Sequence, residues 1–110
     1  MIDVNEIKKV LVERKRIFDE TQDNWDDGVQ MCWDKLIAIL TKDINESIRF
    51  LENECLPDDI YWVSEVFDDI ARKTQSKDFI AAIHRIYDKM PENVKETMEV
   101  DIRSAEQAID

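Results

Sequence analysis

The most distinctive chemical feature of the chain is a row of acidic residues with two aromatic neighbours. Its members recur at spacings of three or four, which places them on one face of a helix. The row consists of Asp58, Tyr61, Glu65 and Asp68, and Asp59, Trp62 and Asp69 lie at its margin. We call these seven residues the acidic row.

Only one sign of charge occurs in this part of the chain. Between Glu52 and Ala71 there are seven acidic residues and no basic residue. Like charges one helical turn apart repel by about 0.2–0.5 kcal/mol per pair, and exposed helix faces usually mix both signs. Tyrosine and tryptophan are enriched where partners dock. The acidic row therefore predicts a binding surface for a positively charged partner, although each acid alone also fits an ordinary solvated helix face.

Residue combinations typical of catalysis do not occur in the sequence. His84 is the only histidine, and we expect a structural role because it falls near the packed face of its helix. Ala81 stands where a Glu-x-x-His motif of a helical di-iron site needs glutamate. The sequence contains no HExxH, glycine-rich phosphate loop or GxSxG motif. We expect no catalytic residue, no cofactor and no enzymatic activity.

Two weaker patterns concern metal ions. Glu65, Asp68 and Asp69 are close enough in sequence to share a divalent cation, so a carboxylate metalloenzyme is an alternative. The segment 23–34 half-resembles a calcium-binding loop with Gly28 at its sixth position. Trp25 occupies the third position, where it cannot bind the ion, and the twelfth position lacks the usual glutamate. We therefore expect no metal site.

The same loop supplies a second group of candidate binding residues. Asp26 and Asp27 belong to a stretch from Asp19 to Asp34 with six acidic residues and no basic one. Trp25 lies among them, either stapling the entry of the following helix or forming an exposed anchor.

Hydrophobic periodicity predicts the helices that position these residues. In the segment that carries the acidic row, Ile60, Val63, Phe67 and Ile70 form one apolar stripe. That stripe predicts a single helix from Pro57, which suits a first helical position, to residue 73. Residues 77–90 form a second helix capped by Ser76, and the short connection between the two helices predicts an antiparallel hairpin.

Similar signals cover the rest of the chain. Asp3 and Asp43 are predicted N-caps of a first and a third helix, and a last helix begins near Glu92. In the first helix we expect Phe18 in the core, with Arg14 contributing only its aliphatic stem. We also expect Trp33 in the core of the second helix. The whole pattern predicts an all-α protein, residues 1–110 as one domain, with five to six helices packed as antiparallel neighbours.

Composition and charge restrict the classes of partner. The formal net charge of -11 disfavours contact with nucleic acid and with anionic membranes. No apolar run approaches the ~20 residues that span a bilayer, and the N-terminus lacks the layout of a secretory signal. Cys32 and Cys55 are scattered, which is typical of free thiols in a reducing compartment, although a disulfide between them is the alternative. We expect a cytoplasmic protein.

The segment from Trp62 to Pro91 resembles small acidic immunity proteins of bacterial toxin–immunity systems, including contact-dependent growth inhibition. The likeness lies in the S-E-V-F-x-x-I core at 64–70, the T-Q-S-K turn at 74–77 and the S-A-E run at 104–106. The resemblance implies that the chain binds and neutralises a cognate toxin, and many such toxins are nucleases with basic clefts. It carries over no site residue.

The resemblance and the acidic row together predict an immunity protein that inhibits a basic toxin domain, with a nuclease as the expected class. The alternative is a helical regulatory or adaptor protein that binds a basic partner without any toxin. The immunity interpretation places the contact on the acidic row, with Asp26 and Asp27 as a second region.

Overall fold

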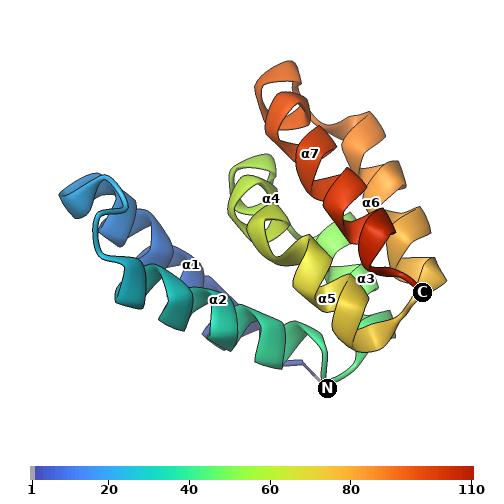
Figure 1. The fold of residues 1–110 in the computed structure, drawn as a ribbon, viewed down its shortest axis with the longest axis horizontal. Coiled ribbons are helices and arrows are strands. Elements are labelled where there is room, and N and C mark those ends of the chain that lie inside the picture. The colour runs from blue at the N-terminus through green and yellow to red at the C-terminus, as the bar shows by residue number, and fades with distance from the viewer. Residues whose placement is uncertain (1) are drawn as a thin grey trace.

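A computed structural model describes residues 2–110, which fold into seven α-helices and one 3-10 turn (Figure 1). The elements in chain order are α1 (Val4–Thr21), α2 (Asp26–Leu40), α3 (Ile44–Asn53), α4 (Pro57–Val63), η1 (Ser64–Val66), α5 (Phe67–Thr74), α6 (Lys77–Lys89) and α7 (Glu92–Ala108). No strand occurs among the described residues, and the all-α fold class predicted from the sequence is confirmed.

Three of the helices begin at the capping residues that the sequence predicts. The Asp3 and Asp43 carboxylates accept hydrogen bonds from the backbone N–H groups of Glu6 (3.0 Å) and Glu46 (3.2 Å). The hydroxyl of Ser76 accepts a hydrogen bond from the backbone N–H three residues later, at 3.0 Å. These bonds satisfy N–H groups that the first turn of a helix otherwise leaves without a partner.

The segment 57–74 is not the single helix that its periodicity predicts. Between α4 and α5 the chain tightens into η1, where the buried Ser64 hydroxyl donates a hydrogen bond to the carbonyl oxygen of Tyr61 at 2.7 Å. A side chain that bonds the backbone in this way competes with regular helix geometry. The elements α4, η1 and α5 together occupy the segment that the sequence predicts as one helix. This break is why the structure has seven α-helices and the sequence predicts five to six.

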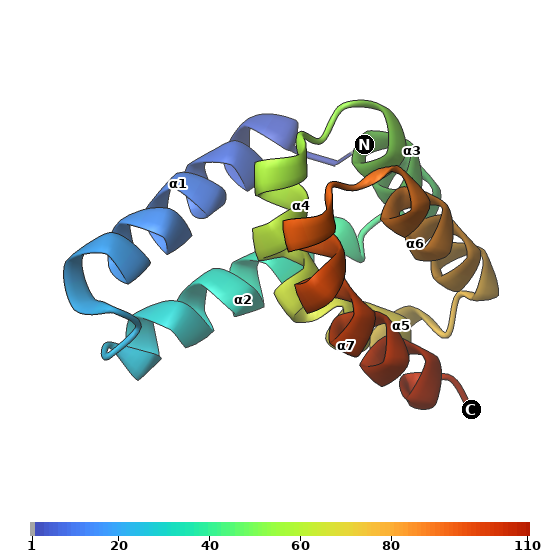
Figure 2. The same cartoon turned by 90° about the horizontal axis from the view of Figure 1, so that it is seen from above.

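The helices form two unequal parts. α1 and α2 pair as an antiparallel arm, and α3 to α7 make up the body (Figures 1 and 2). Within the body α5 packs along α7, α3 packs on α6, and α4 lies against both α1 and α7. α4 therefore lies between α1 and α7, and the candidate site is at this position.

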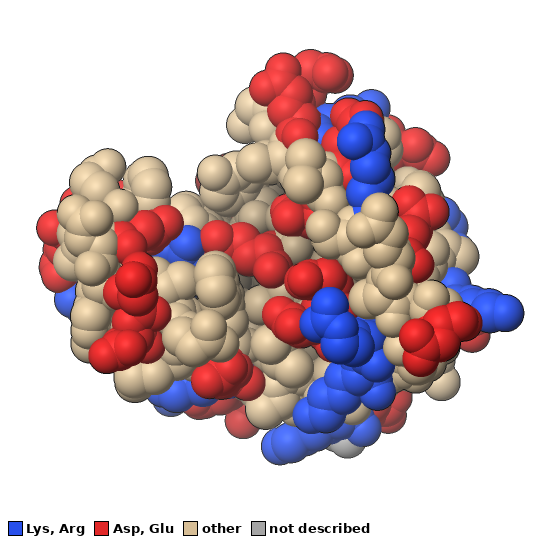
Figure 3. All heavy atoms as spheres, viewed as in Figure 1, with Lys and Arg blue, Asp and Glu red and all other residues tan. Residues whose placement is uncertain are grey.

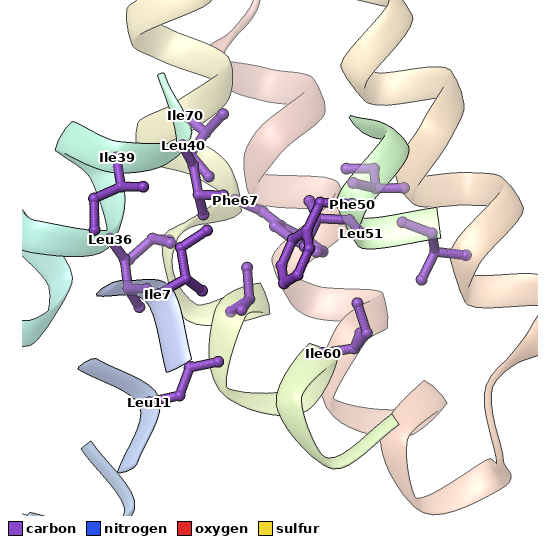
Figure 4. Close-up of a cluster of buried hydrophobic side chains, with 14 of the residues drawn as sticks. Ile7, Leu11, Leu36, Ile39, Leu40, Phe50, Leu51, Ile60, Phe67 and Ile70 are labelled. Atoms are coloured by element: carbon purple, nitrogen blue, oxygen red, sulfur yellow. The ribbon is translucent and has the colours of Figure 1, made fainter. Parts of the chain in front are cut away.

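One hydrophobic core joins the arm to the body. Figure 4 shows Phe67 between side chains of α1 and α2, such as Ile7 and Leu36, and those of α3, such as Phe50 and Leu51. All of these side chains are less than 5% exposed.

Two side chains differ from their predicted positions. Phe18 is 39% exposed near the end of α1, where its ring contacts Trp62 of α4. His84 lies on the exposed side of α6, with its Nε2 3.5 Å from a carboxylate oxygen of Glu106 on α7, so it is not a buried structural histidine.

The chain after α7 is held against the turn between α5 and α6. Gln75, which has a left-handed backbone conformation, donates a side-chain hydrogen bond to the carbonyl oxygen of Ala108 at 2.9 Å. Its side-chain oxygen accepts a hydrogen bond from the backbone N–H of Asp110 at 2.8 Å.

Cys32 and Cys55 are both free thiols, the first buried and the second half-buried. Within residues 2–110, none of the helices combines the length and apolar character needed to cross a bilayer.

Candidate partner-binding surface

A buried arginine fixes the arm to the body beside the acidic row. The Arg14 guanidinium, 2% exposed, donates from Nε and Nη2 to the two carboxylate oxygens of Glu65, at 2.9 and 2.8 Å. It also donates from Nη1 and Nη2 to the two oxygens of Asp23, at 2.6 and 3.1 Å. Two bidentate pairs therefore hold Arg14, and charge-assisted pairs of this kind impose a defined geometry.

Aromatic side chains enclose this ionic cluster. The centre of the Arg14 guanidinium lies 4.8 Å from the centre of the Trp62 ring, a cation–π contact. Trp33 donates its indole N–H to Glu65 at 3.2 Å, so its half-buried ring serves the ionic cluster as well as the core. Phe18 and Tyr61 pack against Trp62, with ring centres 5.6 and 5.0 Å away.

The electrostatics of the cluster explain why Arg14 remains charged. Burial alone disfavours a charged guanidinium, but hydrogen bonds to Asp23 and Glu65 outweigh that cost and raise the pKa of Arg14. The prediction that Arg14 contributes only its stem is wrong, because its entire side chain is buried and paired.

Three acids of the predicted row are occupied by internal ion pairs. Glu65 belongs to Arg14, Asp59 pairs with Lys15 of α1 at 2.8 Å, and Asp69 pairs with Arg72 one turn away at 3.2 Å. The break at η1 turns Glu65 toward the arm, so the acidic row is not one continuous exposed face. For Glu65 and Asp59, the interpretation as freely exposed carboxylates is corrected.

The remaining members of the acidic row keep an outward role. Asp58 is exposed and forms no ion pair among the described residues. Tyr61 is 36% exposed one turn further along α4, and Trp62 is half-buried behind it. Asp68 is half-buried on α5 and lines a different, polar hollow together with Arg72 and residues of α7.

Asp26 and Asp27 lie apart from the acidic row, at the free end of the arm (Figure 1). Both are exposed in the first turn of α2, where the helix dipole favours carboxylates. Trp25 folds its ring over Gly28, where a Cβ atom would stand 2.3 Å from the ring. The ring therefore staples the helix entry while remaining 45% exposed.

Residues of α7 complete a surface that the sequence did not reveal. Tyr61 and Glu65 share a hollow of about 370 Å³ with Glu96, Thr97, Val100 and Asp101. Figure 3 shows this side of the molecule hollowed between the arm and α7, with acidic side chains gathered at the base. We call the surface the acidic notch. It comprises these six lining residues and three neighbours of Tyr61: Trp62, which contacts the Tyr61 ring, Phe18, which contacts Trp62, and Asp58, one turn before Tyr61 on α4.

A sequence signal for the α7 residues does exist. Val100 is 62% exposed because it falls outside the stripe of Val94, Met98 and Ile102. An apolar residue off the stripe, beside Glu96 and Asp101, marks a second exposed mixed face. Its pairing with α4 depends on tertiary packing and is not encoded in any local spacing.

Asp101 is the most perturbed carboxyl group of the notch. Burial raises the pKa of Asp101 to about 6, and repulsion from Glu65 and Asp68 adds to the rise. The neighbouring Ser64 hydroxyl acts in the opposite direction and lowers the pKa of Asp101. A charged Asp101 is therefore costly in the isolated chain and would be stabilised by an added cation.

Within residues 2–110 no group of three His, Cys, Asp or Glu side chains is arranged to hold a metal ion. The half-resemblance to a calcium loop fails on geometry, because α2 already begins at Asp26 and Asp23 is bound to Arg14.

Comparison with protein-family models, with curated proteins and with solved structures finds no match for this chain.

Proposed function

We propose that this chain is an immunity-type inhibitor that binds a basic toxin domain through the acidic notch. The observation that carries the proposal is the gathering of Glu96 and Asp101, which have no internal ion pair among residues 2–110, beside exposed Tyr61 and Val100. Exposed Asp58 lies one turn before Tyr61 on α4. Exposed aromatic and apolar groups next to carboxylates without a cationic partner are typical of a docking surface.

The two kinds of residue act at different stages of binding. The net charge of -11 attracts a basic partner over long distances and raises the association rate about 10–1000-fold at low salt. Tyr61, Phe18 and Val100 then lose water against the partner, which slows dissociation. A nuclease is the toxin class that fits best, because its substrate-binding cleft must be basic to hold a polyanion.

The Arg14 cluster prepares the notch for binding. Its bidentate pair with Glu65 fixes the arm to the body, and its pair with Asp23 fixes the loop within the arm, so little conformational freedom is lost when the partner docks. The protein then covers the basic cleft as a rigid body and keeps the toxin's substrate out.

The direct test is neutralisation of the toxin encoded beside this gene. Tyr61→Ala and Asp58→Lys should each weaken binding about tenfold or more, measured by calorimetry, and abolish protection in a growth assay, because Tyr61 lines the hollow and exposed Asp58 lies one turn before it on α4. Asp88→Lys on the exposed side of α6 is the matched charge reversal and should protect as well as the natural chain. Full protection by both notch variants would overturn the proposal.

A regulatory adaptor is the second candidate function. It is favoured by a separate hollow of about 250 Å³ between α1 and α2, where Trp25 and the 51% exposed Met31 lie over the buried Cys32. An adaptor needs two docking surfaces, whereas an inhibitor needs one. A ternary complex in which the arm and the notch hold different proteins would favour the adaptor.

A further inference from the structure

We propose that the hollow between α4 and α7 receives an arginine side chain of the basic partner, with its stem against Tyr61 and Val100 and its guanidinium against Asp101 and Glu96. This inference rests on the proposed function, and it names the chemical group that anchors the partner.

The size of the hollow selects a side chain as the occupant. A volume of about 370 Å³ accommodates one long side chain with some water. A helix is about 10–12 Å across with its side chains, so a whole helix does not fit there. The partner must therefore insert a projecting group from a surface that rests on the rim.

The lining of the hollow selects arginine. Tyr61, Thr97 and Val100 supply aromatic and apolar surface, and the charged residues are the carboxylates Glu65, Glu96 and Asp101. A guanidinium is planar, stacks on aromatic rings and bonds carboxylates in pairs, whereas the lysine ammonium is a compact, strongly hydrated charge. Arginine therefore matches the aromatic wall and the carboxylates together.

The same molecule already contains an arginine site built from these parts. Arg14 lies over the Trp62 ring and pairs with the carboxylates of Glu65 and Asp23. The adjacent hollow repeats this composition, with Tyr61 in contact with Trp62 and with Glu65 common to both sites. The difference is that no lysine or arginine among residues 2–110 forms an ion pair with Glu96 or Asp101.

The protonation of Asp101 supports this assignment. Carboxylates surround it on three elements: Glu65 on η1, Asp68 on α5 and Glu96 on its own helix, with the Tyr61 phenol on α4. Together with burial, the charges of Glu65 and Asp68 raise its pKa to about 6. An arginine in the hollow would relieve the repulsion, so its binding should strengthen as pH rises from 5 to 7.

The test uses a blocked Gly-Arg-Gly peptide and the complete protein, followed by two-dimensional amide NMR. We expect chemical-shift changes centred on Tyr61, Thr97 and Val100, with millimolar affinity. Asp101→Asn should weaken the peptide about five- to tenfold and remove the pH dependence between 5 and 7. Asp88→Asn on α6 removes the same charge and should leave the affinity unchanged.

Two companion peptides define the outcomes that would overturn the proposal. Citrulline has the shape of arginine without its charge, so equal binding of Gly-citrulline-Gly would contradict the role of the carboxylates. Stronger binding of Gly-Lys-Gly would contradict the choice of arginine. Shifts spread over all acidic helices, or no shifts at tens of millimolar peptide, would contradict the hollow as the site.

This experiment fails separately from the proposed function because it needs no toxin. Peptide binding without neutralisation would uphold the hollow and reject the immunity role. Neutralisation that survives Asp101→Asn, together with absent peptide binding, would uphold the immunity role and reject the arginine anchor.

Discussion

Arg14 replaces apolar packing with ionic pairing at the point where two irregular segments meet. One is the loop after α1, where Gln22 and Asp23 both have positive φ angles of 53° and 65°. The other is the η1 turn, which carries Glu65. Positive φ angles at residues other than glycine cost on the order of 1 kcal/mol each and persist only when other contacts hold them. The guanidinium supplies such a contact at Asp23 and also holds Glu65 of η1.

Replacing Arg14 with methionine should therefore destabilise the protein strongly. The variant leaves Asp23 and Glu65 without their cation, and removing one partner of a buried ion pair costs about 3–5 kcal/mol. Because both carboxylates are partly exposed, we expect about 2–4 kcal/mol in urea unfolding. Arg103→Met breaks an exposed pair with Glu99 and should cost under about 1 kcal/mol. Equal losses in the two variants would contradict the structural role of Arg14.

Asp101 should make stability depend on pH in the opposite sense to an ordinary paired carboxylate. Because its folded pKa of about 6 exceeds the ordinary aspartate pKa of 3.8, the folded state binds more protons between these two pH values. This group therefore favours folding at low pH and loses that contribution as pH rises from about 4 to 6.

Asp101→Asn should remove that loss and stabilise the protein at pH 7 by about 1 kcal/mol, a value that allows for partial solvent exposure. Urea unfolding of both chains at pH 4 and pH 7 measures the effect. The advantage of the variant should appear at pH 7 and vanish at pH 4. An advantage of the same size at both values would show that titration of Asp101 is not its cause.

At the scale of helices, the features that depend on near neighbours could be predicted from the sequence. The caps at Asp3, Asp43 and Ser76 involve residues three positions apart, and the apolar stripes follow from helix geometry alone. The break at Ser64 was missed because the same sequence also fits a regular helix. Tertiary packing, which buries Val63, Val66 and Phe67 completely, favours the tighter turn.

The candidate site was predictable only in part for the same reason. Asp58 and Tyr61 were identified because they share one helix face. The pairing of Arg14 with Glu65 joins residues 51 positions apart, and Asp101 reaches the notch from the last helix. Helical periodicity shows which residues a helix exposes, but it does not show which other helix will lie beside them.

At the scale of the whole molecule, charge should govern the rate at which a basic partner is captured. Eleven net negative charges act together at distances where single contacts do not. The association rate constant should fall about 10–100-fold between low salt and 0.5 M salt, while the dissociation rate constant changes little. Stopped-flow fluorescence with the purified toxin measures both, and a flat salt profile would remove long-range attraction from the mechanism.

The side-chain clamp of Gln75 has a practical consequence for all of these measurements. It ties the backbone at Ala108 and Asp110 to the turn after α5. Glu96 lies twelve residues earlier on the same helix, a separation of about 18 Å along its axis. Any polypeptide joined after Asp110, such as an affinity handle or a fluorescent reporter, would therefore start from a fixed point at the other end of α7 and leave the notch accessible.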